Sequence, residues 1–321
     1  METRKLVRSG NTSFTTALPI NWVRKNNLKP GSEIQITETS RGNLLITTTS
    51  PIEPDSEKKT STTIKVDGKT NEEIRIELLI AYIRDMSSVT LEGKEINIKS
   101  KMIIEAIHDF IGFDIMDQSD KYITIKNFYS LDQETAPRNI NKKIHVINLA
   151  SFELLKTFFE KGLTQENVFE LRKFHNQNKK LSNLTEKSIL KAFNDPALMR
   201  QIQTNRLQLI KEKKIVSAFK KISYRLYYLG KLLSFIERKS PEVELFKVEF
   251  LKIKEHYTSL INAIANKDNE EKIVLLQKFK KHDKLIDDMI NRFEDPLMIQ
   301  AGMSLLIIEL NLKDIGYESL T

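Results

Sequence analysis

The fold of this chain is decided by the stretch Asp195-Pro196-Ala197-Leu198-Met199, which recurs as Asp295-Pro296-Leu297-Met298. Proline suits the first turn of a helix and cannot continue one, so each Asp-Pro predicts the end of one helix and the start of the next. With further breaks at Gly162, Ser240-Pro241 and Lys267-Asp268, the sequence from residue 140 onward predicts six helical segments: 140–161, 164–193, 196–237, 241–266, 269–293 and 296–319.

The order of these segments predicts an internal duplication. In each half a pair of helices ends at the Asp-Pro stretch and a third helix follows, which favours two three-helix bundles at about 138–238 and 241–321. The alternative is that Asp-Pro is simply a common way to break a helix, with no repeat behind it. The third segment, 196–237, is unusually long and is expected to bend near residues 203–206.

The first 50 residues predict a small domain of short strands around one short helix. Pro19 begins the helix, which runs to Asn26 and turns Trp22 and Val23 inward. Strand-like stretches lie on both sides of it, and Gly42-Asn43 is typical of a hairpin turn between the last two. Residues 48–61 carry prolines, serines and alternating charge, and we expect them to form a linker.

A second small domain, mixed in secondary structure, is expected over residues 62–130. Thr70 and Glu73 have the spacing of a capping box, which predicts the start of a helix at this point. A further helix is expected over 100–111, and a hairpin around Ser119-Asp120. With the helical part, 138–321, the chain is predicted to be an α+β multidomain protein.

Composition and charge narrow the class of protein. The chain has 321 residues and 40% hydrophobic content, enough to fill real cores, and its formal net charge of +8 is compatible with a nucleic-acid or anionic membrane partner. It has no cysteine, which excludes disulfides and thiolate metal sites. The N-terminus lacks the apolar core of a signal peptide, and the longest uncharged apolar run, 296–308, is shorter than the roughly 20 residues of a membrane span. We therefore expect a soluble, cytoplasmic protein with no transmembrane segment.

Enzyme signatures are missing from the sequence. The chain contains neither a G-x-x-x-x-G-K-[ST] or G-x-G-x-x-G phosphate loop nor a G-x-S-x-G nucleophile elbow. With ten glycines in 321 residues there is little from which to build a phosphate-cradling loop. We therefore expect a protein that is not an enzyme.

Two stretches carry a family resemblance. Leu18-Pro19-Ile20-Asn21-Trp22-Val23 followed by Leu28-Lys29-Pro30-Gly31-Ser32-Glu33-Ile34 resembles the SpoVT–AbrB swapped-hairpin domain. The segment 107–125, with Ile111-Gly112-Phe113-Asp114-Ile115-Met116, resembles the part that joins AbrB and PhoU domains in archaeal phosphate-uptake regulators. The six helices then match PhoU, which is a pair of three-helix bundles. The resemblance implies an AbrB-like domain at 1–50 and a PhoU-like helical domain at 138–321.

The resemblance implies a regulator of phosphate homeostasis that forms a homodimer and binds DNA. Residues 1–50 carry seven basic and three acidic side chains, and basic side chains neutralise DNA phosphates and release counterions. The expected DNA-binding residues are Arg4, Lys5, Arg8, Arg24 and Lys25. The alternative is an adaptor without a DNA role, whose AbrB-like module only dimerises while the helices dock on a phosphate transporter subunit or a sensor kinase.

The metal motifs of the family are only partly present. PhoU proteins carry acidic E/D-x-x-x-D motifs on two helices of each repeat, but the first repeat here has Asn176-Gln177-Asn178-Lys179-Lys180, and Tyr227 and Lys231 on the partner helix. The second repeat keeps Asp283 and Asp287 at i, i+4, and Asp314 on the last helix. We expect no metal in the first repeat and at most a weak divalent-metal site in the second, the alternative being a solvated helix surface. No other cofactor is expected.

The histidines show no His-x-x-x-His spacing, and no cysteine is present to complete a zinc site. We therefore expect each of the five to lie on the surface or at a helix end: His108, His145, His175, His256 and His282.

Overall fold

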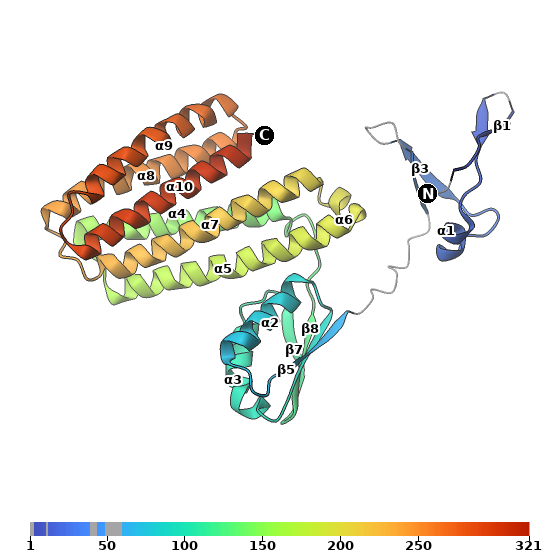
Figure 1. The fold of residues 1–321 in the computed structure, drawn as a ribbon, viewed down its shortest axis with the longest axis horizontal. Coiled ribbons are helices and arrows are strands. Elements are labelled where there is room, and N and C mark those ends of the chain that lie inside the picture. Colours follow the sequence, from blue (N-terminus) through green and yellow to red (C-terminus); the bar gives the residue numbers. More distant parts are fainter. Residues whose placement is uncertain (1–2, 11, 39–43, 49–59, 321) are drawn as a thin grey trace. The chain divides into compact units, whose positions relative to one another are not determined.

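The computed structural model describes residues 3–10, 12–38, 44–48 and 60–320 (Figure 1). The chain divides into two compact units, Met1–Thr60 and Ser61–Thr321. The predicted turn at Gly42-Asn43 and most of the predicted linker lie outside the described residues. The protein is of the α+β class, with small sheets toward the N-terminus and helices from residue 137 to the C-terminal end.

The first unit consists of two hairpins and one helix. Strand β1 (Val7–Ser9) pairs antiparallel with β2 (Ser13–Thr15), and β3 (Ile34–Glu38) pairs antiparallel with β4 (Leu44–Thr48). Between the hairpins lies α1 (Ile20–Lys25), which follows Pro19 as the sequence predicts. Each hairpin forms its own two-stranded sheet. Isolated two-stranded sheets are marginally stable in water, so their stability depends on what covers them.

Little apolar surface is covered within this unit. Trp22 and Val23 on α1 are half-buried, and among the residues that are described before Thr60 none of the apolar side chains is fully buried. Several are more than half exposed: Leu6, Val7, Phe14, Ile20, Ile36 and Leu44. The side chains that are described in this unit therefore do not form a hydrophobic core within a single chain.

The second unit begins with a four-stranded sheet whose strand order is β5-β6-β8-β7. Its strands and helices follow the chain as β5 (Ser61–Lys65), α2 (Asn71–Ile83), β6 (Ser88–Glu92), α3 (Ile96–Ile107), β7 (Phe113–Gln118) and β8 (Tyr122–Asn127). The β5–β6 pair is parallel and the other two pairs are antiparallel. The predicted capping box is confirmed, because Thr70 and Glu73 each accept a hydrogen bond from the other's backbone amide. Helix α3 begins four residues earlier than the predicted 100.

Seven helices complete the described chain: α4 (Pro137–Lys161), α5 (Gln165–Asn194), α6 (Pro196–Gln201), α7 (Arg206–Leu233), α8 (Pro241–Ala265), α9 (Asn269–Ile290) and α10 (Pro296–Leu320). The predicted long third segment is divided into α6 and α7. Asp195 caps α6 through the amides of Ala197 and Leu198, and Asn205 caps α7 through the amide of Gln208. Between these caps Gln203 takes a left-handed conformation, φ 51°, which ends α6.

The long helices pack in two groups of three. Helices α4, α5 and α7 contact one another, as do α8, α9 and α10, and α7 lies along α10 (Figure 1). The α7–α10 contact is antiparallel, since Tyr228 donates a hydrogen bond to Gln300 (2.7 Å) while Lys214 pairs with Glu318 (2.6 Å). The helical part is therefore two three-helix bundles joined along their third helices.

A glycine marks the tightest packing in each bundle. A Cβ on Gly230 of α7 would meet Leu171 and Leu155, and one on Gly316 of α10 would meet Leu276 and Leu260. Leu260 follows Leu155 by 105 residues, and Leu276 follows Leu171 by the same 105. Gly316 follows Gly230 by 86 residues. This correspondence is what an internal duplication would produce.

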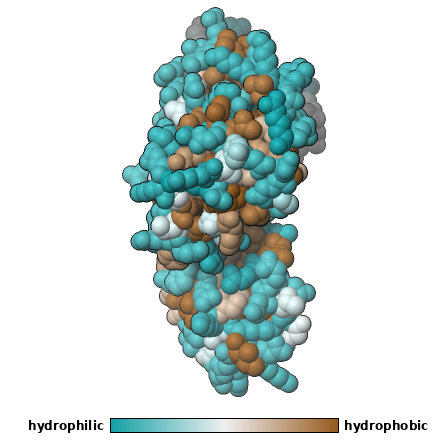
Figure 2. Space-filling view, turned by 90° about the vertical axis from the view of Figure 1, so that its left-hand side faces the viewer, coloured by the Kyte–Doolittle hydropathy of each residue, from teal (hydrophilic) through white to brown (hydrophobic). Residues whose placement is uncertain are grey.

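The surface of the second unit is mostly hydrophilic on the side that Figure 2 shows, with apolar side chains scattered among the polar ones. Its apolar residues gather instead in a continuous core that includes Phe152, Phe219, Phe250 and Tyr257. Among the described residues, none of the helices combines the length and the apolarity that crossing a bilayer requires.

Candidate functional site

The five predicted DNA-binding residues are all exposed in the first unit. Arg4 and Lys5 precede β1, Arg8 lies on it, and Arg24 and Lys25 end α1. The Arg8 guanidinium donates a hydrogen bond to the carbonyl of Gly10 across the hairpin turn. Exposed basic side chains suit contact with a phosphate backbone.

The three predicted metal ligands lie on α9 and α10 but do not converge. Asp283 is paired with Lys313 on α10, while Asp287 and Asp314 are exposed. A lysine beside Asp283 competes with a cation for the carboxylate. Among the described residues, Asp283, Asp287 and Asp314 do not form a group whose ligand atoms lie together as a metal site requires.

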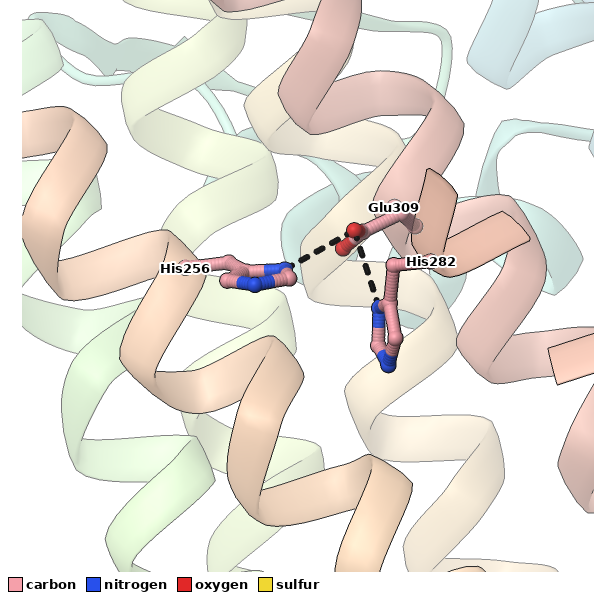
Figure 3. Close-up of side chains that lie close together, drawn as sticks. All are labelled: His256, His282 and Glu309. Atoms are coloured by element: carbon pink, nitrogen blue, oxygen red, sulfur yellow. Dashed lines mark hydrogen bonds and ion pairs between the residues drawn. The ribbon is translucent and has the colours of Figure 1, made fainter. Parts of the chain in front are cut away.

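A different group of titratable side chains meets inside the second bundle (Figure 3). His256 comes from α8, His282 from α9 and Glu309 from α10, and their ligand atoms all lie within 4.8 Å of one another. His256 Nδ1 is 2.9 Å and His282 Nδ1 is 3.1 Å from the same oxygen, Glu309 Oε1. The other ring nitrogen of His282, Nε2, lies 2.5 Å from Glu249 Oε2 on α8.

These side chains are largely out of contact with solvent. Glu309 is 0% exposed, His282 4%, Glu249 12% and His256 15%. Burial alone would lower the pKa of His282, but hydrogen bonds to Glu309 and Glu249 and their negative charges outweigh it, so the pKa is raised. Burial would raise the pKa of Glu309, but the hydrogen bonds from His256 and His282 outweigh it, so the pKa is lowered. The cluster therefore holds a carboxylate against protonation inside a protein core.

The expectation that the histidines lie on the surface or at helix ends is wrong for His282, which is buried in the middle of α9. Spacing along one helix could not reveal the cluster because its members come from three helices. One signal was present in the sequence: Glu309 is the single charged residue in the otherwise apolar stretch Leu305-Leu306-Ile307-Ile308-Glu309-Leu310. A lone carboxylate in an apolar helix needs a buried partner.

The first bundle has a neutral polar layer at the corresponding level. Ser223 precedes Gly230 by the same seven residues that separate Glu309 from Gly316. The amide nitrogen of Asn178 donates hydrogen bonds to Ser223 (3.1 Å) and to Asn148 (2.8 Å). All three side chains are buried. His175 Nδ1 lies 3.4 Å from Ser223 Oγ, so this layer pairs a histidine with a hydroxyl where the second bundle pairs histidines with a carboxylate.

A cavity of about 480 Å³ lies between the two bundles, lined by the ends of α4, α8, α9 and α10 and by α7. Its lining includes the cationic side chains of Arg138, Lys142, Lys211, Lys267 and Lys272, against the carboxylates of Glu212 and Glu318. Burial, opposed by the charge of Asp268, lowers the pKa of Lys272, and Lys211 adds to the lowering. The chemistry of the cavity suits an anion better than a cation.

No family model, curated protein or solved structure matches this chain. Its function is therefore inferred from the fold and from the residues described above.

Proposed function

We propose that this chain is a cytoplasmic, non-enzymatic regulator of phosphate homeostasis that binds DNA as a homodimer through its first unit. In the proposal, the first unit is an AbrB-like swapped-hairpin domain and the helical part is a PhoU-like body that receives the signal. The observation that carries it is the combination found in the first unit: exposed basic side chains at the first hairpin and on α1, together with two hairpins whose described apolar side chains are not fully buried.

A second copy of the chain is the proposed cover for the apolar faces of the hairpins. Leu6, Val7 and Phe14 are 71%, 60% and 66% exposed, and Ile36 and Leu44 are 58% and 67% exposed. Burying one such side chain stabilises by about 1.5–3 kcal/mol, so together they provide enough free energy to hold a dimer. Interleaved hairpins from two chains would bury these faces and duplicate the basic surface, as a two-fold DNA site requires.

The direct test is a binding titration of the full chain against a labelled mixed-sequence DNA duplex at several salt concentrations. Affinity should fall steeply with salt, and each phosphate contact that is lost should reduce the slope of log affinity against log salt by about 0.9. The double variant Arg8→Ala, Arg24→Ala should bind weakly with a shallower slope. Lys278→Ala, Lys280→Ala, which removes the same charge from exposed positions of α9, is the matched control and should bind like the wild type.

The competing function is the adaptor, in which the first unit dimerises and the helices dock on a phosphate transporter subunit or a sensor kinase. It predicts that the Arg8→Ala, Arg24→Ala variant retains whatever weak, non-specific affinity the wild type shows. An affinity that is equal in the wild type and this variant would therefore rule out the DNA-binding proposal and leave the adaptor.

A further inference from the structure

The arrangement of His256, His282 and Glu309 is more specific than a buried polar network requires. Both imidazoles present Nδ1 to one carboxylate oxygen, at 2.9 and 3.1 Å, and they do so from two different helices (Figure 3). The Ser223–Asn178 layer of the first bundle is built from neutral side chains, with no carboxylate among Ser223, Asn178 and Asn148. An ionised carboxylate that faces two imidazoles in the core of the second bundle is therefore a feature that the first bundle does not share at this layer.

The distances fit a tetrahedral metal ion. Bonds of about 2.0–2.1 Å from a tetrahedral ion to nitrogen and oxygen place neighbouring ligand atoms about 3.3 Å apart. The two nitrogen–oxygen distances in the cluster are shorter than this by only a few tenths of an ångström, and all three ligand atoms lie within 4.8 Å of one another. Small side-chain rotations would therefore open the space that an ion occupies.

A second observation points to a missing partner. Glu309 Oε2 is buried and accepts no hydrogen bond from the residues that the structure describes. A buried carboxylate oxygen without a partner is costly, and a cation bound by the same carboxylate would remove that cost. This oxygen belongs to the side chain that both histidines already face.

The surroundings of His282 complete the pattern of a metal ligand. A histidine that binds a metal through one ring nitrogen usually donates the proton of the other to a carboxylate, which fixes the ring and increases its basicity. His282 Nε2 lies 2.5 Å from Glu249 Oε2, which leaves Nδ1 as the nitrogen that faces Glu309. Glu249 is itself paired with Lys252, 3.1 Å away.

We propose that His256, His282 and Glu309 bind one transition-metal dication of the zinc class in the core of the second bundle. Two imidazoles and one carboxylate suit such an ion better than Ca²⁺ or Mg²⁺, which take oxygen ligands. On binding, His282 Nδ1 loses its proton to solvent, while the Nε2–H of His282 stays hydrogen-bonded to Glu249. His256 Nδ1 loses its proton to solvent or to Nε2 of its own ring, and in both rings the Nδ1 lone pair then faces the ion. The set is different from Asp283, Asp287 and Asp314, which lie elsewhere on α9 and α10.

The test is a Co²⁺ titration of the full chain after dialysis against a chelator and then against metal-free buffer. One Co²⁺ per chain should bind and give the intense visible absorption of tetrahedral Co²⁺, and added Zn²⁺ should displace it. His256→Gln should abolish this absorption. Glu249→Gln, which leaves the three ligands in place, should weaken binding by about 10- to 100-fold.

Two controls keep the test specific. His145→Gln replaces a half-buried histidine that faces Tyr257 rather than the cluster, and Asp283→Asn, Asp287→Asn removes the acidic pair on α9. Both should bind Co²⁺ like the wild type. His256 is the more exposed of the two ligand histidines, so its variant is the one expected to fold, which circular dichroism would verify. Failure of the wild type to bind, equal binding by His256→Gln, or loss of binding in the Asp283, Asp287 variant would each overturn the proposal.

Discussion

The ammonium of Lys187 lies 3.3 Å from Asp85 Oδ1, although the Lys187 side chain is 0% exposed. Lys187 belongs to α5, and Asp85 follows α2, so this pair joins the four-stranded sheet region to the first bundle. The ammonium also lies over the rings of Tyr82 and Tyr129, at 4.3 and 4.8 Å from their centres, and donates to Asn127. Burial lowers the pKa of Lys187 to about 8, while Asp85 acts to raise it.

Replacing Asp85 by Asn should therefore lower the pKa of Lys187 below about 8, because the charge that opposes burial is removed. The same change leaves a buried ammonium without its counter-charge and should reduce the free energy of unfolding by about 3 kcal/mol. An NMR titration of the lysine side chain and urea unfolding measure the two effects. Asp109→Asn is the matched control, since its partners Lys179 and Lys180 are farther away and more exposed, and it should cost under about 1 kcal/mol. Equal costs would mean that burial is not the cause.

The cluster in the second bundle predicts a pH window of stability for the metal-free chain. The raised pKa of His282 means that its charged form stabilises the fold below the ordinary value of 6.5, and this contribution is lost as pH rises through the raised pKa. The lowered pKa of Glu309 means that its contribution is present above 4.5 and is lost as pH falls through the lowered pKa. Urea unfolding should show the largest contribution of the cluster between about pH 4.5 and 6.5.

In that experiment His282→Gln should remove the loss of stability at the upper edge of the window. Exposed His108 provides the control, and His108→Gln should leave the pH profile unchanged. A wild-type profile that stays flat from pH 5 to 8 in chelator would contradict the charge assignment of His282.

The packing around Gly230 predicts a cost for any side chain at this position. A Cβ there would overlap Leu171 Cδ1, so Gly230→Val should destabilise the first bundle by about 2 kcal/mol through overpacking. A double-mutant cycle with Leu171→Ala checks the cause, because the smaller partner leaves room for the new side chain. The valine should then cost clearly less than in the wild-type background. Simple additivity of the two changes would show that Leu171 is not the obstacle.

The apolar faces of the hairpins predict a homodimer that depends on Phe14 and Leu44. Introducing Glu at both positions should raise the dissociation constant of the full chain about 100-fold or more, since each change removes at least about 1.5 kcal/mol of apolar burial. Sedimentation equilibrium measures this directly. Ile98→Glu, at an 84% exposed position in the second unit, should leave the association unchanged. A wild-type chain that sediments as a folded monomer at low micromolar concentration would end the dimer hypothesis.

The sequence predicts the elements of this fold best where a short stretch decides the structure. Thr70 with Glu73, and Asp195 with Pro196, are local signals, and both place a helix start where the structure has one. The limits of α3 are less predictable, because no comparable cap stands before Ile96. The His–Glu cluster depends on which faces of α8, α9 and α10 turn toward one another, and this orientation is set by the packing of distant residues. Hence Asp283 and Asp287 could be singled out from their spacing, while His256 and His282 could not.

The antiparallel contact of α7 and α10 has a symmetry that follows from the matching glycines. Adding 86 to Tyr228 gives Asp314, and subtracting 86 from Gln300, its hydrogen-bond partner, gives Lys214. Asp314 and Lys214 line the same surface hollow. Lys214 forms its ion pair with Glu318, one turn beyond Asp314 on α10. The two polar contacts of this helix pair thus lie near positions that exchange under the offset, as in an approximate two-fold interface. The helical part therefore resembles a dimer of three-helix bundles in which both bundles belong to one chain. In a dimer of identical chains every substitution appears in both bundles. In a single chain that contains both bundles, one bundle can carry Glu309 while the other carries Ser223 at the corresponding position.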